Sequence, residues 1–181
     1  MIFNSDPWKR ELKRIAHTLG KYQGQRRWSD ASYARFEQSV MVGCYIVRRI
    51  AESFQPMIVA QTSIPLLAFP ATKESYRLWW PVVAEHFDLS KSRRVNQSLK
   101  FIYDQMIHTY VFSPWFDENH KLAGVFFSSD REKDECVFRL GIDELIQVFE
   151  NIATIKGKFQ LRFGPDRNEQ IMPRSKPATD H

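Results

Sequence analysis

Residues 92–116 read SRRVNQSLKFIYDQMIHTYVFSPWF, and the spacing of the apolar side chains changes within them. As far as Tyr110 these side chains recur every three or four residues, which is typical of one face of a helix. They are Val95, Leu99, Ile102, Tyr103, Met106, Ile107 and Tyr110. From Tyr110 to Phe116 the period is two, which is typical of a strand. The change predicts a long helix over Ser92–Tyr110 that is followed by a strand.

Two segments further along the chain have the same period of two, Leu122–Ser128 and Cys136–Leu140, and polar turns separate them. Together with Tyr110–Phe116 they predict a three-stranded antiparallel meander. A helix with one apolar face is expected after Gly141. The weak alternation over Lys156–Phe163 allows a final strand.

The first half of the chain reads as helical. A first helix is expected to have Asp6 as its N-cap and Pro7 at its first helical position, and to stop at Gly20. A second helix is expected over Ser32–Phe54. Its middle, Val40–Val47, is apolar on both sides, which predicts a central helix that also supports a homodimer.

Between these helices and the meander, prolines break the pattern. The segment Pro56–Pro70 is expected to be an extended crossing, and a shorter helix is expected over Lys73–Phe87. That helix carries Trp79 and Trp80, which either fill the core or stack on bases. The fold class predicted is α+β, mainly α: a helical bundle with a small antiparallel three-stranded meander. One domain is expected over residues 1–163, followed by a polar, mobile tail over 164–181.

Composition excludes several classes of protein. The chain has 181 residues, of which 43% are hydrophobic, so it can bury a core. Cys44 and Cys136 are too far apart in sequence for a cysteine-based zinc site, and the histidines are not paired at helical spacing. Gly-rich phosphate loops and the nucleophile elbow are absent. We therefore expect no metal and no cofactor. Since no secretory signal and no membrane span is found, a cytoplasmic protein is expected.

Charge is unevenly distributed along the chain. Residues 1–50 carry ten Lys and Arg against four Asp and Glu, whereas residues 115–152 carry four against nine. The net charge of the whole chain is +5. Two solvated faces explain this distribution. The alternatives are a basic surface for an anionic partner, such as RNA, and head-to-tail self-association.

One side of the predicted helix over Ser92–Tyr110 is polar. Arg94, Gln97 and Gln105 lie on it with Asp104 and His108, and they form the expected nucleic-acid contact. His108 at the end of this stripe has two interpretations. It carries protons near neutral pH, or it is a cation that complements the carboxyl end of the helix dipole.

The run Lys100–Tyr110 resembles the signature helix of the HEPN superfamily, helical-bundle proteins found among prokaryotic toxins, antiphage systems and RNA-processing enzymes. In this resemblance Asp104 takes the polar position, His108 takes the place of the histidine, and Tyr110 is the aromatic residue that follows it. The segment Val42–Ser53 resembles the long central helix of some such proteins.

The arginine of the superfamily's active members has no counterpart at residues 101–103. The resemblance therefore implies a noncatalytic protein that acts by dimerising or by binding RNA or a protein, as an accessory to a nucleic-acid or defence system. The alternative is a metal-independent ribonuclease. In it His108 is the base near the 2′-hydroxyl, with Asp104 beside it, and Arg48 or Arg49 from a neighbouring helix is the cation near the phosphate.

Overall fold

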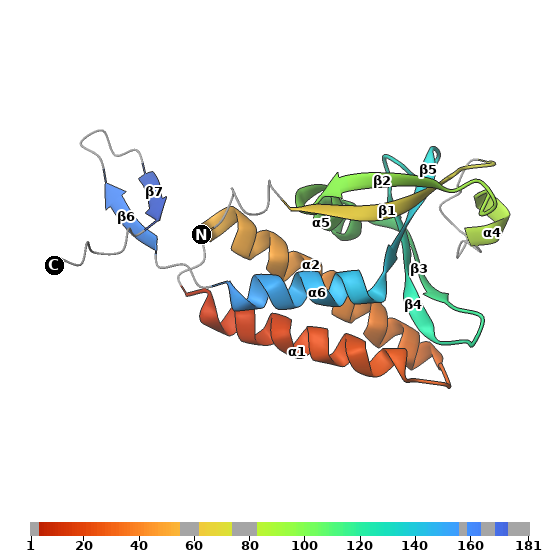
Figure 1. The fold of residues 1–181 in the computed structure, drawn as a ribbon, viewed down its shortest axis with the longest axis horizontal. Helices are drawn as coiled ribbons and strands as arrows, with labels where there is room; N and C mark the ends of the chain where they lie inside the picture. The colour runs from red at the N-terminus through yellow and green to blue at the C-terminus, as the bar shows by residue number, and fades with distance from the viewer. Residues whose placement is uncertain (1–3, 55–61, 74–82, 156–158, 164–168, 174–181) are drawn as a thin grey trace, which may run out of the picture.

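The computed structural model describes residues 4–54, 62–73, 83–155, 159–163 and 169–173. Along the chain the helices and strands are α1 (Asp6–Gln23), α2 (Asp30–Phe54), β1 (Ser63–Pro70), α4 (Val83–His86), β2 (Arg93–Ser98), α5 (Leu99–Ile107), β3 (Thr109–Phe116), β4 (Leu122–Ser129), β5 (Cys136–Gly141), α6 (Ile142–Thr154), β6 (Phe159–Phe163) and β7 (Glu169–Pro173). Figure 1 shows their arrangement.

Five of the strands form one antiparallel sheet in the order β2-β1-β5-β4-β3. Strand β1, from the first half of the chain, lies between β2 and β5, which are separated from it by long stretches of sequence. The sheet is strongly twisted, so that β1 and β2 run in a visibly different direction from β3 and β4 (Figure 1). Strands β6 and β7 pair with each other in a separate two-stranded sheet.

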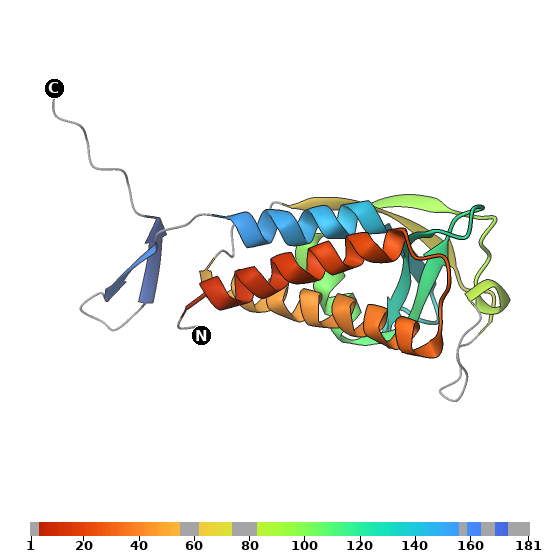
Figure 2. The same ribbon diagram turned by 90° about the horizontal axis from the view of Figure 1, so that it is seen from below.

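Three long helices lie side by side in both views, and α6 and α5 pack against the sheet (Figures 1 and 2). The main core lies between these helices and what we call the inner face of the sheet. Its largest fully buried side chains include Leu12, Leu19, Phe36, Ile50, Leu99, Met106, Phe127, Leu140 and Phe149. Helices α2 and α6 come so close that a Cβ at Gly43 would overlap the ring of Phe149.

The opposite, outer face of the sheet carries a second, smaller core. Its buried members are Phe69, Val83, Phe87, Val111, Phe126 and Val137. Two of them, Val83 and Phe87, come from α4 and the residue that follows it. Helix α4 therefore covers one end of the outer face.

The first two helices follow the sequence prediction with shifted ends. Helix α1 begins at Asp6, one residue before the expected start at Pro7, because Ser5 rather than Asp6 occupies the N-cap position. The helix continues through Gly20 to Gln23. Gly24 is its C-cap, and its N–H donates to the carbonyls of Lys21 and Tyr22. Gly20 is tolerated inside the helix because it is exposed and no other side chain lies near its Cα.

The predicted fold class, a helical bundle with a small three-stranded meander, is wrong. The meander is confirmed as β3, β4 and β5, but it is part of a five-stranded sheet that β1 and β2 complete. The predicted helix over residues 92–110 is also wrong, because residues 93–98 form β2 and only Leu99–Ile107 is helical. Ser98 makes this boundary, since its Oγ accepts a hydrogen bond of 3.1 Å from the backbone N–H of Phe101.

The segment expected to cross the core in an extended form contains a true strand. Pro65 lies inside β1, but the pairing with β5 begins only at Leu67. The N–H that Pro65 lacks is therefore not needed for a hydrogen bond to β5, which helps the strand to tolerate the proline. The helix expected over Lys73–Phe87 appears among the described residues only as α4, and Trp79 and Trp80 lie outside them.

The remaining expectations concern the C-terminal part and the membrane. The helix after Gly141 is confirmed as α6, and the weak final strand is confirmed as β6. Strand β7 falls within the expected tail, whose residues 164–168 and 174–181 lie outside the described part of the chain. No helix in the described part is long and apolar enough to cross a membrane.

Candidate functional site

One row of paired residues crosses the outer face of the sheet. Arg94 of β2 pairs with Leu67 of β1, Leu67 pairs with Arg139 of β5, and Arg139 pairs with Phe126 of β4. Directly paired residues have their side chains on the same face, and neighbouring strands lie about 4.8 Å apart. The two arginines thus stand on the outer face on either side of Leu67, with backbones about 10 Å apart.

A cavity of about 590 Å³ opens beside this row. We call it the outer-face hollow and define it by Pro65, Leu67, Arg94, Trp115, Arg139 and Glu144. The size is within the range of small-molecule sites. The smaller outer core, under α4, occupies the other end of the same face, so this end of the sheet is the part that the helix leaves open.

Two glycines allow other groups to approach the sheet closely beside the hollow. Gly124 of β4 pairs with Gly141 of β5, and Trp115 of β3 pairs with Gly124. A Cβ at Gly124 would overlap the carbonyl oxygen of Leu140 and would come within 3.1 Å of the Trp115 ring. Because neither position has a side chain, these groups pack directly against the backbone, and Gly141 lines the hollow.

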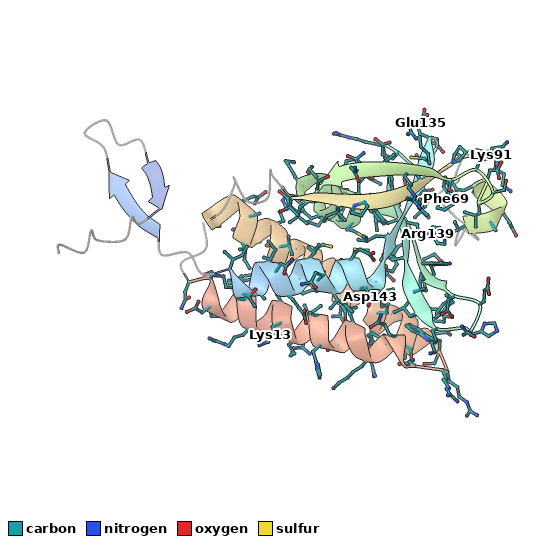
Figure 3. The ribbon with its side chains drawn as sticks, viewed as in Figure 1. Lys13, Phe69, Lys91, Glu135, Arg139 and Asp143 are labelled. Atoms are coloured by element: carbon teal, nitrogen blue, oxygen red, sulfur yellow. The ribbon has the colours of Figure 1, made fainter. Side chains whose placement is uncertain are left out.

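Arg139 occupies the centre of the site. Its guanidinium carbon lies 4.0 Å from the centre of the Trp115 ring and 5.3 Å from the centre of the Phe69 ring. Figure 3 labels Phe69 and Arg139 next to each other on the sheet, with Asp143 on the first turn of α6. The two rings hold the side chain in place through cation–π contacts.

The charge on Arg139 is not neutralised by the rest of the described chain. No carboxylate of a described residue lies within ion-pair distance of its guanidinium. Burial lowers its pKa, but an arginine stays protonated at any physiological pH. A partly desolvated, unpaired cation is therefore available to an anion that enters the hollow.

Three carboxylates also line the cavity. Asp117 is occupied by the turn after β3, since its Oδ1 accepts hydrogen bonds from the backbone N–H groups of Asn119 and Lys121. Asp143 accepts a 2.8 Å hydrogen bond from Gln23 of α1. Glu144, in the first turn of α6, makes neither a side-chain hydrogen bond nor an ion pair with a described residue. Its carboxylate reaches the place that a side chain at position 141 would fill.

The structure brings together some of the site residues expected from the sequence. Helices α2 and α5 pack side by side, and Arg48 lies 3.8 Å from Asp104 across them. Asp104 also pairs with Lys100, and Glu52 pairs with Arg48 at 2.7 Å and with Arg49 at 3.6 Å. These charges form a partly exposed ion-pair network that joins the two helices.

His108 lies at the carboxyl end of α5. It is exposed and takes the C-cap position, and its backbone N–H donates to the carbonyl of Asp104. A cation here complements the helix dipole. Both expected arginines, Arg48 and Arg49, pair with Glu52, and Arg48 also pairs with Asp104. The ribonuclease stays a prediction.

The expected nucleic-acid residues are dispersed. Gln105 is 8% exposed, and its Oε1 accepts a 2.8 Å hydrogen bond from the backbone N–H of Ser129. Gln97 is half-buried in β2, opposite Ile64 of β1. Arg94 is the member of this set that lines the outer-face hollow.

Sequence reasoning missed Arg139 and Trp115. Both lie in strands that the period of two predicted correctly, Cys136–Leu140 and Tyr110–Phe116. The available signal was the pair of glycines at strand positions, Gly124 and Gly141, since a glycine in a strand marks a close approach of other groups.

Neither metal binding nor similarity to known proteins assigns a role to this site. Within the described ranges no group of three or more His, Cys, Asp or Glu side chains could hold a metal ion. No family model, curated protein or solved structure matches the chain.

Proposed function

We propose that the chain is a noncatalytic binding protein that holds an anionic group of its ligand in the outer-face hollow. The observation that supports this most is Arg139, a cation that contacts two aromatic rings in an open cavity, with no ion-pair partner among the described residues. A guanidinium fixed in this way binds a carboxylate or phosphate without first having to be ordered.

The mixture of charges favours a small ligand over a polyanion. The hollow is lined by three basic side chains, Arg94, Lys121 and Arg139, and by the three carboxylates described above. A surface that binds RNA needs clustered Lys and Arg to neutralise successive phosphates. Acidic groups in the same cavity repel a second and third phosphate, whereas one anionic group can still reach Arg139.

The walls favour a ligand with an apolar body. Leu67 and Trp115 are only partly buried, and Pro65 is exposed, so together they offer an apolar surface beside the cation. Small-molecule sites commonly combine such walls with a few polar groups that fix orientation. Benzoate and phenyl phosphate are suitable probes, because each carries one anionic group on a flat apolar ring.

The test is titration calorimetry of the full chain with these two probes. Arg139→Gln removes the charge but keeps most of the side chain, and Arg131→Gln is the matched control in the exposed turn after β4. A charge-assisted hydrogen bond contributes enough for the loss of Arg139 to weaken binding at least about tenfold. The proposal is wrong if neither probe binds the wild type, or if Arg139→Gln binds both probes as well as Arg131→Gln does.

A further inference from the structure

We infer that the ligand of the outer-face hollow is a free amino acid with an apolar side chain, bound through both its α-carboxylate and its α-ammonium group. This inference rests on the proposed function and goes one step further, because it assigns a second charge to the ligand. It is carried by the joint presence of Arg139 and Glu144 in one cavity without an ion pair between them.

The two charges lie at different points of the same strand end. Arg139 and Gly141 are two residues apart on β5, so their Cα atoms are separated by about 7 Å. The carboxylate of Glu144 folds back over Gly141, in the space that a side chain there would occupy. The hollow thus presents a cation at Arg139 and, two residues further along β5, the carboxylate of Glu144 over Gly141.

Opposite charges that do not pair with each other leave room for a ligand between them. A carboxylate on Arg139 and an ammonium on Glu144 each gain a charge-assisted hydrogen bond. In an α-amino acid both groups are attached to one carbon, so they can lie between the two side chains while the rest of the ligand points away. A simple carboxylate satisfies Arg139 but leaves Glu144 unpaired.

The apolar walls suit the remainder of such a ligand. The carboxylate of Glu144 fills the space over Gly141, so a ligand whose ammonium group binds it lies at the end of β5. Its side chain then lies against Leu67 and Trp115, which are partly buried. The cavity of about 590 Å³ is large enough for an aromatic amino acid.

The experiment compares three probes that differ in one charge each: L-phenylalanine, N-acetyl-L-phenylalanine without the ammonium, and L-phenylalaninamide without the carboxylate. Binding to the full chain is measured by titration calorimetry. The wild type is expected to bind L-phenylalanine at least about tenfold more tightly than either derivative, which is the factor that one charge-assisted hydrogen bond supplies.

Two variants separate the two ends of the ligand. Glu144→Gln is expected to abolish the preference for L-phenylalanine over the N-acetyl derivative, and Arg139→Gln to abolish the preference over the amide. Glu150→Gln, an exposed position further along α6, is expected to change neither preference.

The outcomes distinguish this inference from the proposed function. If the wild type binds N-acetyl-L-phenylalanine as tightly as L-phenylalanine, the second charge is wrong while the anion site stands. If Glu144→Gln keeps the full preference, the ammonium is not bound there and the inference is overturned. If none of the three probes binds, and benzoate and phenyl phosphate do not bind either, both proposals fail.

Discussion

Arg139 stacks on Trp115, with its guanidinium carbon 4.0 Å from the centre of the indole ring. Trp115 is paired with Gly124 across β3 and β4, and a Cβ at Gly124 would come within 3.1 Å of the indole. The ring thus packs against the glycine and also contacts the cation, which it helps to fix over the sheet. The guanidinium makes no hydrogen bond or ion pair with a described residue, so its N–H groups are available to a ligand.

This relationship predicts that Trp115 controls affinity through the orientation of Arg139. Trp115→Leu removes the flat surface and is expected to weaken benzoate binding several-fold, because the arginine must then be ordered when the ligand binds. Trp115→Phe keeps a flat ring and is expected to retain most of the affinity. Titration calorimetry with both variants checks this, and equal affinity of Trp115→Leu and the wild type would show that the ring plays no part.

Gln105 is expected to be a structural residue. Its Oε1 accepts the backbone N–H of Ser129 where the pairing of β3 with β4 shifts register after Thr109. Gln105→Met keeps the length of the side chain but leaves that buried donor without its partner. We expect the free energy of unfolding to fall by about 1–3 kcal/mol, measured in urea.

The control for this experiment is Gln38→Met, an exposed position on α2. It is expected to change stability by less than about 0.5 kcal/mol. Equal stabilities of Gln105→Met and Gln38→Met would mean that the hydrogen bond to Ser129 contributes nothing to folding.

Cys44 is expected to make the free energy of unfolding depend on pH in the alkaline range. Burial raises the pKa of its thiol to about 12, well above the ordinary value of 9.0 that it has in the unfolded chain. Above pH 9 the unfolded chain therefore loses this proton while the folded chain keeps it, so the contribution of the thiol to stability falls as pH rises. Between pH 8.5 and 10.5 the wild type is expected to lose about 1–2 kcal/mol more than Cys44→Ala.

Urea unfolding of both proteins across that pH range measures the difference. Groups other than Cys44 titrate alike in the two chains, so their contributions cancel in the comparison. Parallel stability curves for the wild type and Cys44→Ala would contradict the account of a buried, protonated thiol.

His108 is expected to be dispensable. The proposed function predicts that the wild type does not cleave a labelled single-stranded RNA, with or without a chelator, and that His108→Ala behaves identically. Since the side chain is exposed, its loss is expected to change stability by no more than about 1 kcal/mol. Cleavage by the wild type that falls about 10²–10⁴-fold in His108→Ala would instead establish the ribonuclease.

Local sequence patterns were sufficient to predict those helices and strands whose packing partners lie nearby in the chain. The period of two located β3, β4 and β5, and the apolar stripes located α1, α2 and α6, because their inner faces are set by neighbours in sequence. Strand β2 could not be found in this way. It is an edge strand in which every residue other than Val95 is polar, so no apolar alternation marks it.

The hollow itself depends on which strands become neighbours. Arg139 faces Leu67 and Arg94 only because β1, from residues 63–70, inserts beside β5. Strand pairing between segments that are far apart in sequence leaves no local pattern. Arg94 was therefore selected as part of the helix predicted over residues 92–110, although it lies in β2, and Arg139 was missed. The proximity of Arg48 and Asp104 could be predicted from the sequence, because it required only that two helices pack side by side.

The most direct test of the central claim is the response of the Arg139 Nε–H signal in a ¹H–¹⁵N spectrum to added benzoate. Arg139→Gln assigns the signal by its disappearance, and the Nε–H of Arg131 is the internal reference. The account predicts a saturable shift of the Arg139 signal with an unchanged Arg131 signal. An Arg139 signal that does not move, while the protein is folded and benzoate is in large excess, would contradict the claim that this arginine is the anion-binding group of the hollow.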